Sequence, residues 1–392
     1  MTQPNYNRTI RCSFVGYIVQ AIVINYLPLL FVTLQTTYDI PLEKITMLVT
    51  VNFTLQLTVD LLSAAFLDRI GYRAGMVLAH SCAAVGLILL PILPRIMDPF
   101  TGILISVLAY AVGGGLLEVL VSPVVESCPT ERKEQTMSLL HSFYCWGQVA
   151  VVLISTLFFA VFGIENWGIM AWTWAIIPIV NGLIFLKAPM CPIVPEGEKT
   201  MSAGQLFRRG IFWVFLILMF CAGASEQAVS QWASAFAETS LGISKTMGDL
   251  AGPMTFAITM GTARVIYAKF GDRIRLDSFM LGSCALCVLA YLMISLSPWP
   301  PLSLIGCAVC GFSVGILWPG TFSQATASLR NGGTVMFAML ALSGDLGCAL
   351  GPSLVGYVSS AANDRLQTGI LCALVFPVAT IAIQLLRKKK KA

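Results

Sequence analysis

Long apolar stretches alternate with short polar or Gly/Pro-containing breaks along the whole chain. Each stretch is close to the length of about 20 residues that an α-helix needs to cross the hydrocarbon core of a bilayer. The pattern therefore predicts an all-α membrane protein with twelve transmembrane helices. The expected helices cover residues 9–35, 45–67, 73–94, 101–126, 136–163, 167–188, 211–238, 246–270, 275–297, 300–328, 334–360 and 366–387.

One polar segment, residues 187–210, is longer than the other breaks and divides the twelve stretches into six and six. It predicts an N-terminal six-helix bundle at residues 1–188 and a C-terminal six-helix bundle at 211–392. We expect residues 189–210 to form a cytoplasmic linker between the two bundles.

Composition narrows the classes of function. Of the 392 residues, 57% are hydrophobic and 11% are charged, whereas soluble domains carry roughly 25% charged residues. This excludes a soluble domain and a nucleic-acid binder with a basic face, and makes the lipid bilayer the expected surroundings of the chain. The sequence contains no Walker loop, Gly-x-Ser-x-Gly elbow or Cys/His metal cluster. We therefore expect a protein that is not an enzyme and holds no metal or cofactor. We also expect it to be a monomer.

The positions of Lys and Arg predict the orientation, because cytoplasmic loops of membrane proteins are enriched in both residues. With both termini in the cytoplasm, only four of the 24 basic residues fall in outer loops, and Arg264 falls within a helix. The four are Lys44, Arg95, Lys245 and Arg365. We expect a multi-pass protein of the bacterial inner membrane with this orientation.

The two halves of the chain repeat each other. Asp-Arg-Ile follows the second predicted helix at 68–70 and the eighth at 272–274. Parallel repeats of this kind build many transporters around a central site at mid-membrane depth, so we expect two pseudo-symmetric bundles. Three further matches join equivalent helices: Gly115 with Gly315, Gly147 with Gly347, and Asn25-Tyr26 with Gln231-Trp232.

The segment 64–73, Ala-Ala-Phe-Leu-Asp-Arg-Ile-Gly-Tyr-Arg, resembles the signature loop of the major facilitator superfamily, although Ala64 replaces its first glycine. With twelve helices, the charge bias and the repeat, the chain is identified as a member of that superfamily. The resemblance implies the superfamily fold and transport by alternating access. It also implies gating by the loop, in which a carboxylate meets a helix N-terminus and holds one conformation shut. The gating residues are then Asp68, Arg69 and Arg73, with Asp272 and Arg273 in the second copy.

A narrower resemblance lies in helices 4 and 5. Three glycines at 113–115 precede Glu118, Ser122-Pro123 follows, and Phe143 lies in the next helix. This arrangement is similar to the fucose:proton symporter branch, although Ser122 stands where that branch has an asparagine. The resemblance implies a proton as the coupling ion and a sugar as the solute, but not fucose itself.

Ionisable residues inside the predicted helices give the sharpest functional signal, because a charge at the bilayer centre costs at least about 2.5 kcal/mol. Glu118 and Glu226 lie in helices that line the central cavity in the superfamily, so we interpret them as proton-coupling residues. The alternative is that each only bonds the solute or a neighbouring helix. Asp345 is interpreted as a second proton site or as a partner of Arg264. Asp60 and Arg264 each lie eight residues before a motif aspartate, and we expect gating or interhelix pairing there.

Amides and aromatic rings in the cavity helices suit a sugar, because amides bond hydroxyl groups and aromatic faces cover the apolar C–H face of the ring. Alternatively, such residues pack helices together or anchor them at the interface. The candidate substrate-binding residues are Gln20, Asn25, His141, Trp146, Gln148, Gln227, Gln231, Trp232 and Trp318.

These patterns favour a secondary active transporter that moves a small polar solute, a sugar, by proton-coupled alternating access. Sodium is an open alternative to the proton, because carboxylates and carbonyl groups also coordinate it. A proton-coupled drug or metabolite exporter is the second candidate. A solute sensor that does not transport is the third.

Overall fold

The computed structural model describes residues 6–129, 133–191, 201–270, 275–329 and 332–391. These residues form helices joined by short connections, so the predicted all-α class is confirmed. The chain divides into two compact units, unit 1 at Met1–Glu196 and unit 2 at Gly197–Ala392. Each unit is described by itself below.

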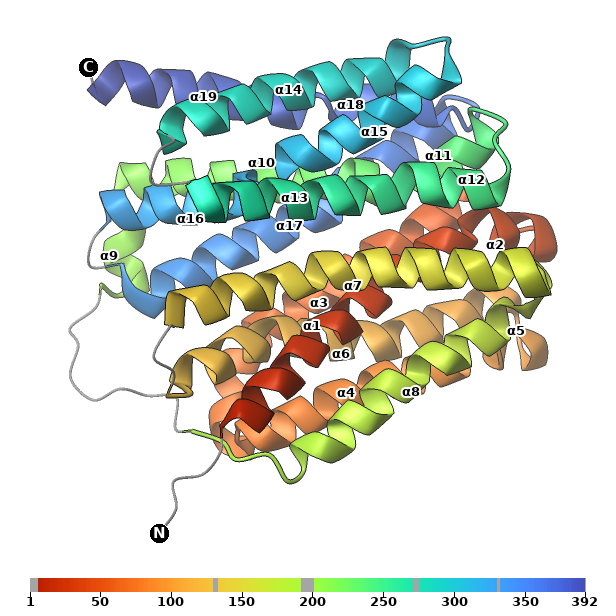
Figure 1. Cartoon of the computed structure of the whole chain (residues 1–392), viewed down its shortest axis with the longest axis horizontal. Helices are drawn as coiled ribbons and strands as arrows, with labels where there is room; N and C mark the ends of the chain where they lie inside the picture. The colour runs from red at the N-terminus through yellow and green to blue at the C-terminus, as the bar shows by residue number, and fades with distance from the viewer. Residues whose placement is uncertain (1–5, 130–132, 192–200, 271–274, 330–331, 392) are drawn as a thin grey trace. The chain divides into compact units, whose positions relative to one another are not determined.

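Unit 1 runs from the red to the yellow-green part of the chain in Figure 1. Short 3-10 turns at Leu27–Leu30 and Ile164–Asn166 precede its second and last helices. The helices are α1 (Asn7–Asn25), α2 (Phe31–Tyr38), α3 (Leu42–Ile70), α4 (Tyr72–Leu89), α5 (Leu93–Ile96), α6 (Pro99–Ser127), α7 (Lys133–Phe162) and α8 (Trp167–Phe185).

Unit 2 runs from green to blue in Figure 1. A π-helical segment, Leu250–Met254, joins its fourth helix to its fifth. The helices are α9 (Ala203–Phe207), α10 (Gly210–Ser230), α11 (Ala233–Thr239), α12 (Lys245–Asp249), α13 (Thr255–Phe270), α14 (Leu276–Leu296), α15 (Pro300–Val314), α16 (Leu317–Ser328), α17 (Gly333–Ala361), α18 (Leu366–Ala373) and α19 (Val375–Lys391).

Eleven helical segments within the described residues are long and apolar enough to cross a membrane. They correspond to eleven of the twelve predicted helices. The remaining prediction, residues 246–270, is helical too, but α12 and the π-helical segment leave only 16 residues for α13. Pro253 lies in the π-helical segment, and proline removes a backbone donor from a helix, which explains the local change of winding.

Two predicted helices are broken at matching positions of the repeat. In unit 1, α1 ends at Asn25, and the 3-10 turn that follows has Pro28 near its start. In unit 2, α10 ends at Ser230 and α11 begins at Ala233, so Gln231 and Trp232 form the break. The matched dipeptides Asn25-Tyr26 and Gln231-Trp232 therefore both lie where a membrane helix is interrupted.

Part of the predicted linker belongs to unit 2. Helix α9 begins with a capping box, in which Ser202 and Gln205 satisfy each other's backbone N–H groups. Leu206 of α9 is fully buried in a cluster with Phe212 and Phe215 of α10. This packing fixes the end of the linker on unit 2.

Arg387, the first residue of the basic run near the C-terminus, also enters the core of unit 2. Arg387 of α19 is buried, and its guanidinium donates hydrogen bonds to the side-chain oxygens of Gln324 and Gln384. The guanidinium also lies 4.5 Å from the centre of the Phe215 ring, a cation–π contact. Arg387 therefore fastens α19 to α10 and α16.

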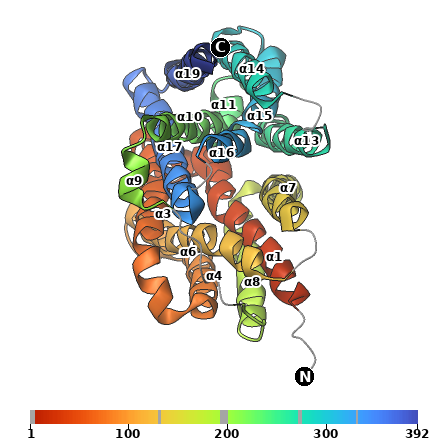
Figure 2. The same cartoon turned by 90° about the vertical axis from the view of Figure 1, so that its left-hand side faces the viewer.

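Close helix contacts in unit 2 depend on glycine. Figure 2 shows α10 beside α17, and these two helices pack extensively. A Cβ atom at Gly347 of α17 would overlap the backbone carbonyl oxygen of Phe220 in α10. Small residues let helix backbones approach in this way, which is how membrane helices gain packing energy.

We expect Gly347→Ala to destabilise the protein by about 2 kcal/mol, because the new methyl group forces the α10 and α17 backbones apart. The apparent Tm of the purified protein, measured by intrinsic fluorescence, reports the change. Gly282→Ala in α14 is the matched control, because a Cβ there meets nothing within 4 Å. Equal Tm values for the two variants would contradict the backbone contact.

Candidate functional site

Gln20 and Glu118 form the centre of a polar cluster inside unit 1. Gln20 lies near the end of α1 and is 2% exposed. Its side-chain Nε2 donates a hydrogen bond of 2.8 Å to Oε2 of Glu118 in α6. The structure thus brings together one predicted substrate-binding residue and one predicted proton-coupling residue.

Asp60 of α3 joins the same cluster. Gly115 of α6 packs so tightly on α3 that a Cβ there would lie 3.0 Å from the Cα of Gln56 and from the Cβ of Val59. Asp60 follows Val59, and Glu118 lies one helical turn after Gly115. One carboxylate oxygen of Asp60 consequently lies within 4.8 Å of one of Glu118. The sequence predicts a gating role for Asp60, whereas the structure places it beside a coupling candidate.

Tyr17 extends the cluster by one turn and was missed in the sequence. Its hydroxyl group is 2.8 Å from the hydroxyl of Ser122 in α6, and its ring centre lies 5.3 Å from that of His141 in α7. Tyr17 and Gln20 are three residues apart, so they share one face of α1. The spacing from Gln20 could therefore have identified Tyr17 as a site residue in the sequence.

The corresponding region of unit 2 has an ion pair. Nη2 of Arg264 in α13 lies 3.6 Å from Oε2 of Glu226 in α10, and both side chains are largely buried. The Nε of Arg264 also donates a 3.2 Å hydrogen bond to the carbonyl oxygen of Gly315. The guanidinium offsets the negative charge of the Glu226 carboxylate. Arg264 therefore pairs α13 with α10 through Glu226, which fits the interhelix pairing that the sequence suggests.

Two further amides continue from Glu226 along α10. Gln227 donates a 3.3 Å hydrogen bond to Oε1 of Glu226, and Gln231 donates a 3.0 Å hydrogen bond to Oε1 of Gln227. Both predicted solute ligands are buried. In this structure their amides are thus used within a chain that leads from the ion pair to the break of the helix.

The two polar regions occupy equivalent positions of the repeat. As Gly115 packs on Gln56 and Val59, so Gly315 packs on Met260 and Ala263 of α13. The next residues of α3 and α13, Asp60 and Arg264, are therefore structural counterparts.

The broken helices show which residues of α1 and α10 are counterparts. The breaks at Asn25-Tyr26 and Gln231-Trp232 align α1 with α10, and this alignment places Gln20 on Glu226. Gly115 and Gly315 likewise place Glu118 on Trp318. Unit 1 therefore has an amide and two carboxyl groups where unit 2 has a carboxylate, an indole and a guanidinium.

The predicted aromatic ligands have different surroundings. Trp232 is fully buried, and its indole N–H donates a 3.0 Å hydrogen bond to the carbonyl oxygen of Pro352. The Trp318 ring packs on the backbone of Gly344 in α17. Trp146 is 47% exposed. Trp232 and Trp318 thus contact neighbouring helices of unit 2, whereas Trp146 has a free ring surface.

The remaining predicted polar ligands lie on α1 and α7. Asn25 is buried, and its side-chain N–H donates to the carbonyl oxygen of Ala21 on its own helix. Gln148 is buried, next to Gly147, which contacts α1. His141 is exposed, and its ring contacts that of Tyr17.

The gating residues are only partly described. Asp272 and Arg273 lie outside the described residues, and Asp68 and Arg69 lie in α3 with side chains outside the described set. Arg73, at the start of α4, donates a 2.9 Å hydrogen bond to the carbonyl oxygen of Ala188 just after α8. Asp345 is buried in α17 of unit 2.

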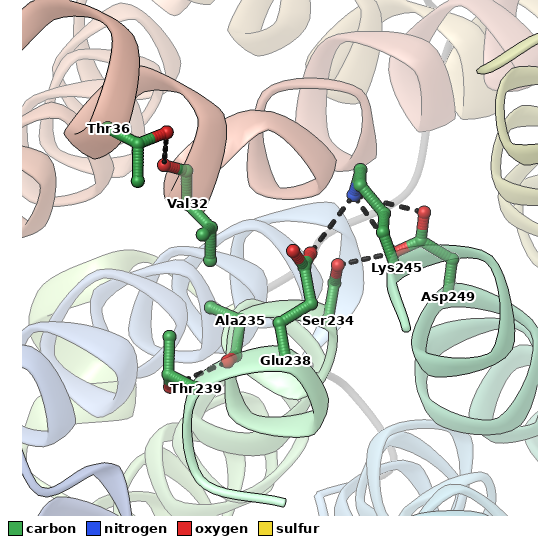
Figure 3. Close-up of polar contacts among 8 residues, drawn as sticks. All are labelled: Val32, Thr36, Ser234, Ala235, Glu238, Thr239, Lys245 and Asp249. Carbon is green, nitrogen blue, oxygen red and sulfur yellow. Dashed lines mark hydrogen bonds and ion pairs between the residues drawn. The ribbon is translucent and has the colours of Figure 1, made fainter. Parts of the chain in front are cut away.

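A second buried charge cluster in unit 2 was not predicted. Figure 3 shows the ammonium group of Lys245 between Glu238 of α11 and Asp249 of α12, at 3.3 and 3.1 Å. The hydroxyl of Ser234 also donates to Asp249, whose side chain has no exposed surface. The ion pairs close the hairpin between α11 and α12, just after the break between α10 and α11.

We expect Lys245→Met to destabilise the protein by about 2 kcal/mol, because it leaves buried Asp249 without its cation while the Ser234 hydrogen bond remains. Thermal unfolding in detergent measures the loss. Lys44→Met, at an exposed lysine of unit 1, is the control and should change stability by less than about 0.5 kcal/mol. A Lys245→Met protein as stable as the control would show that the ion pairs contribute nothing.

The chain is similar to known proteins both in sequence and in fold. The sequence profile of the Major Facilitator Superfamily matches residues 12–352. A search of curated protein sequences finds no match.

Several solved structures are similar over nearly the whole chain. A bacterial homologue of the human lysosomal transporter Spinster, inward-facing and unoccupied, has a TM-score of 0.76 at 13% identity, covering 98% of this chain and 97% of that one. The E. coli fucose:proton symporter FucP has a TM-score of 0.65 at 15% identity, covering 97% and 99%. The human organic anion transporter MFSD10 has a TM-score of 0.67 at 16% identity, covering 97% and 100%. At these identities the likeness concerns the fold.

Proposed function

Because this chain belongs to the Major Facilitator Superfamily, and is therefore an integral membrane transporter and not an enzyme, we propose that it is a proton-coupled secondary transporter of a small polar solute. We further propose a sugar as the solute and alternating access as the mode of transport. The proposal places a monomer in the bacterial inner membrane with both termini in the cytoplasm. Its coupling ion is the proton.

The observation that carries the proposal is the environment of Glu118. This carboxyl group lies inside a membrane helix beside an amide, Gln20, and a second carboxyl group, Asp60. A charged carboxylate is costly there, so binding and release of a proton changes its energy strongly. Glu226, in contrast, is paired with Arg264, which favours a fixed charge.

The polar side chains around this carboxyl group support a hydroxylated solute. Tyr17 lies one turn from Gln20 on α1, Ser122 lies one turn from Glu118 on α6, and His141 of α7 contacts the Tyr17 ring. Hydroxyl, amide and imidazole groups both donate and accept hydrogen bonds, as sugar hydroxyl groups do. Among the similar structures, one is named a fucose:proton symporter and another an organic anion transporter. Organic anions are therefore the solutes against which hexoses should be compared.

The proposal is tested in proteoliposomes with an imposed inward proton gradient. Labelled hexoses, organic anions and lipophilic cations are offered separately, with the proton gradient, a sodium gradient or no gradient. We expect at least one hexose to accumulate above its outer concentration with the proton gradient alone.

Three outcomes would contradict the proposal. Accumulation driven by sodium alone would replace the proton as the coupling ion. Movement of only lipophilic cations against the proton gradient would indicate an exporter. Solute binding without any flux would indicate a sensor.

A further inference from the structure

We propose that Asp60 and Glu118 form one proton-binding dyad, in which the two carboxyl groups share a single proton during the transport cycle. The inference rests on the proposed proton coupling. It adds Asp60 to the coupling machinery, where the sequence alone suggests gating.

The distance between the two groups makes them act together. One carboxylate oxygen of Asp60 lies within 4.8 Å of one of Glu118, and both residues lie in membrane-spanning segments, in α3 and α6. Two negative charges this close repel strongly away from bulk water. One proton removes the repulsion, whereas a second proton brings no comparable gain, so the pair titrates as a unit.

Gln20 is suited to serve both states of the dyad. Its Nε2 donates to Glu118, whereas its Oε1 is buried and has no hydrogen-bond partner in the described structure. The carbonyl oxygen of an amide lies only about 2.3 Å from its nitrogen, so the unused acceptor is held next to the same carboxyl group. When Glu118 takes up the proton, a turn of the amide presents Oε1 to the new O–H donor.

Unit 2 contains the same framework with the charge fixed. Arg264 is the counterpart of Asp60, and Glu226 is the counterpart of Gln20. The guanidinium 3.6 Å from Glu226 offsets the negative charge of that carboxylate. Asp60, at the equivalent position, supplies a second negative charge, which favours uptake of a proton. The repeat therefore assigns proton exchange to unit 1 and a permanent charge pair to unit 2.

Two other titratable side chains belong to this cluster. Tyr17 of α1 bonds Ser122 of α6, and His141 of α7 contacts the Tyr17 ring. Both side chains can donate and accept hydrogen bonds. Tyr17 and His141 are candidates for contacting the solute or for passing the proton on. The shared proton itself is held by Asp60 and Glu118.

The test is an infrared titration of the full chain in lipid nanodiscs, because the carbonyl stretch of a protonated carboxyl group is observed directly and without a known solute. We expect the wild-type protein to show a protonated-carboxyl band that Glu118→Gln moves to lower pH, because Asp60 then titrates without a second negative charge beside it. In Asp60→Asn the band should remain. The proton concentration at the midpoint of its titration should be at least about tenfold higher than in the wild-type protein, since the repelling charge is gone. Asp60→Arg, which copies Arg264, should leave no such band at neutral pH.

Two controls keep the result interpretable. Glu43→Gln changes an exposed carboxyl group of α3 and should leave the band unchanged. Size-exclusion chromatography identifies variants that have not folded, and Asp60→Asn, which preserves shape, carries the test if Asp60→Arg misfolds.

A midpoint in Asp60→Asn equal to that of the wild-type protein would overturn the dyad, even if Glu118 still couples transport in vesicles. Loss of the band on addition of Na⁺ at constant pH would also overturn it, because the pair would then bind the metal ion. Conversely, a dyad titration without any proton-driven flux would leave the dyad in place and remove the proposed transport function.

Discussion

Glu118→Gln is expected to abolish uphill accumulation of solute in proteoliposomes while exchange of solute across the membrane continues. With one proton per solute, an inward gradient of two pH units supports an accumulation of up to about a hundredfold, and the variant should fall to about equal concentrations. Glutamine keeps the size of the side chain and a hydrogen bond to Gln20. It cannot hold a proton, so the solute should cross without its coupling ion.

The measurement compares labelled solute uptake under an imposed proton gradient with exchange at equal concentrations on both sides. Glu43→Gln, an exposed carboxyl-to-amide change in α3, should behave as the wild-type protein in both assays. If Glu118→Gln still accumulates solute against its gradient, Glu118 is not the coupling residue. Loss of exchange together with accumulation would point to a binding role for the side chain instead.

Much of the fold was predictable because membrane helices have a simple signature. The length and hydropathy of the apolar stretches identify the helices, and the polar breaks between the stretches mark the connections. The repeat was predictable from Gly115 and Gly315, because both glycines serve the same backbone approach in the two units. The break in the first predicted helix lies beside Pro28, but the break in the seventh was not predictable, since Gln231-Trp232 contains neither glycine nor proline.

The pairing of side chains could not be read from the sequence. Glu118 was predictable as an acid inside a membrane helix, but its neighbour Asp60 depends on how α3 and α6 are rotated against each other at Gly115. Arg264 had several possible partners, and only the packing of α10 on its neighbours selects Glu226. Asp249 lies beside a predicted helix end, where a charge is ordinary, and only the closed hairpin shows that it is buried.

Arg264→Met should be among the most destabilising single substitutions in unit 2. It leaves the carboxylate of Glu226 buried without its cation, which costs about 3 kcal/mol after partial relief by protonation. It also removes the hydrogen bond to the carbonyl oxygen of Gly315. For a unit of this size the apparent Tm should fall by roughly 6 to 12 °C. Thermal unfolding in lipid nanodiscs measures the change.

The double variant Glu226→Gln with Arg264→Met separates the charge from the packing. It removes both ions and leaves a neutral amide of the same shape, so most of the lost stability should return. Arg73→Met, at an exposed arginine with one hydrogen bond to Ala188, controls for loss of an arginine and should change the Tm little. If the double variant were as unstable as Arg264→Met, the loss would come from packing around the arginine stem. The fixed-charge role of unit 2 would then lack support, and the contrast with Asp60 and Glu118 would rest on unit 1 alone.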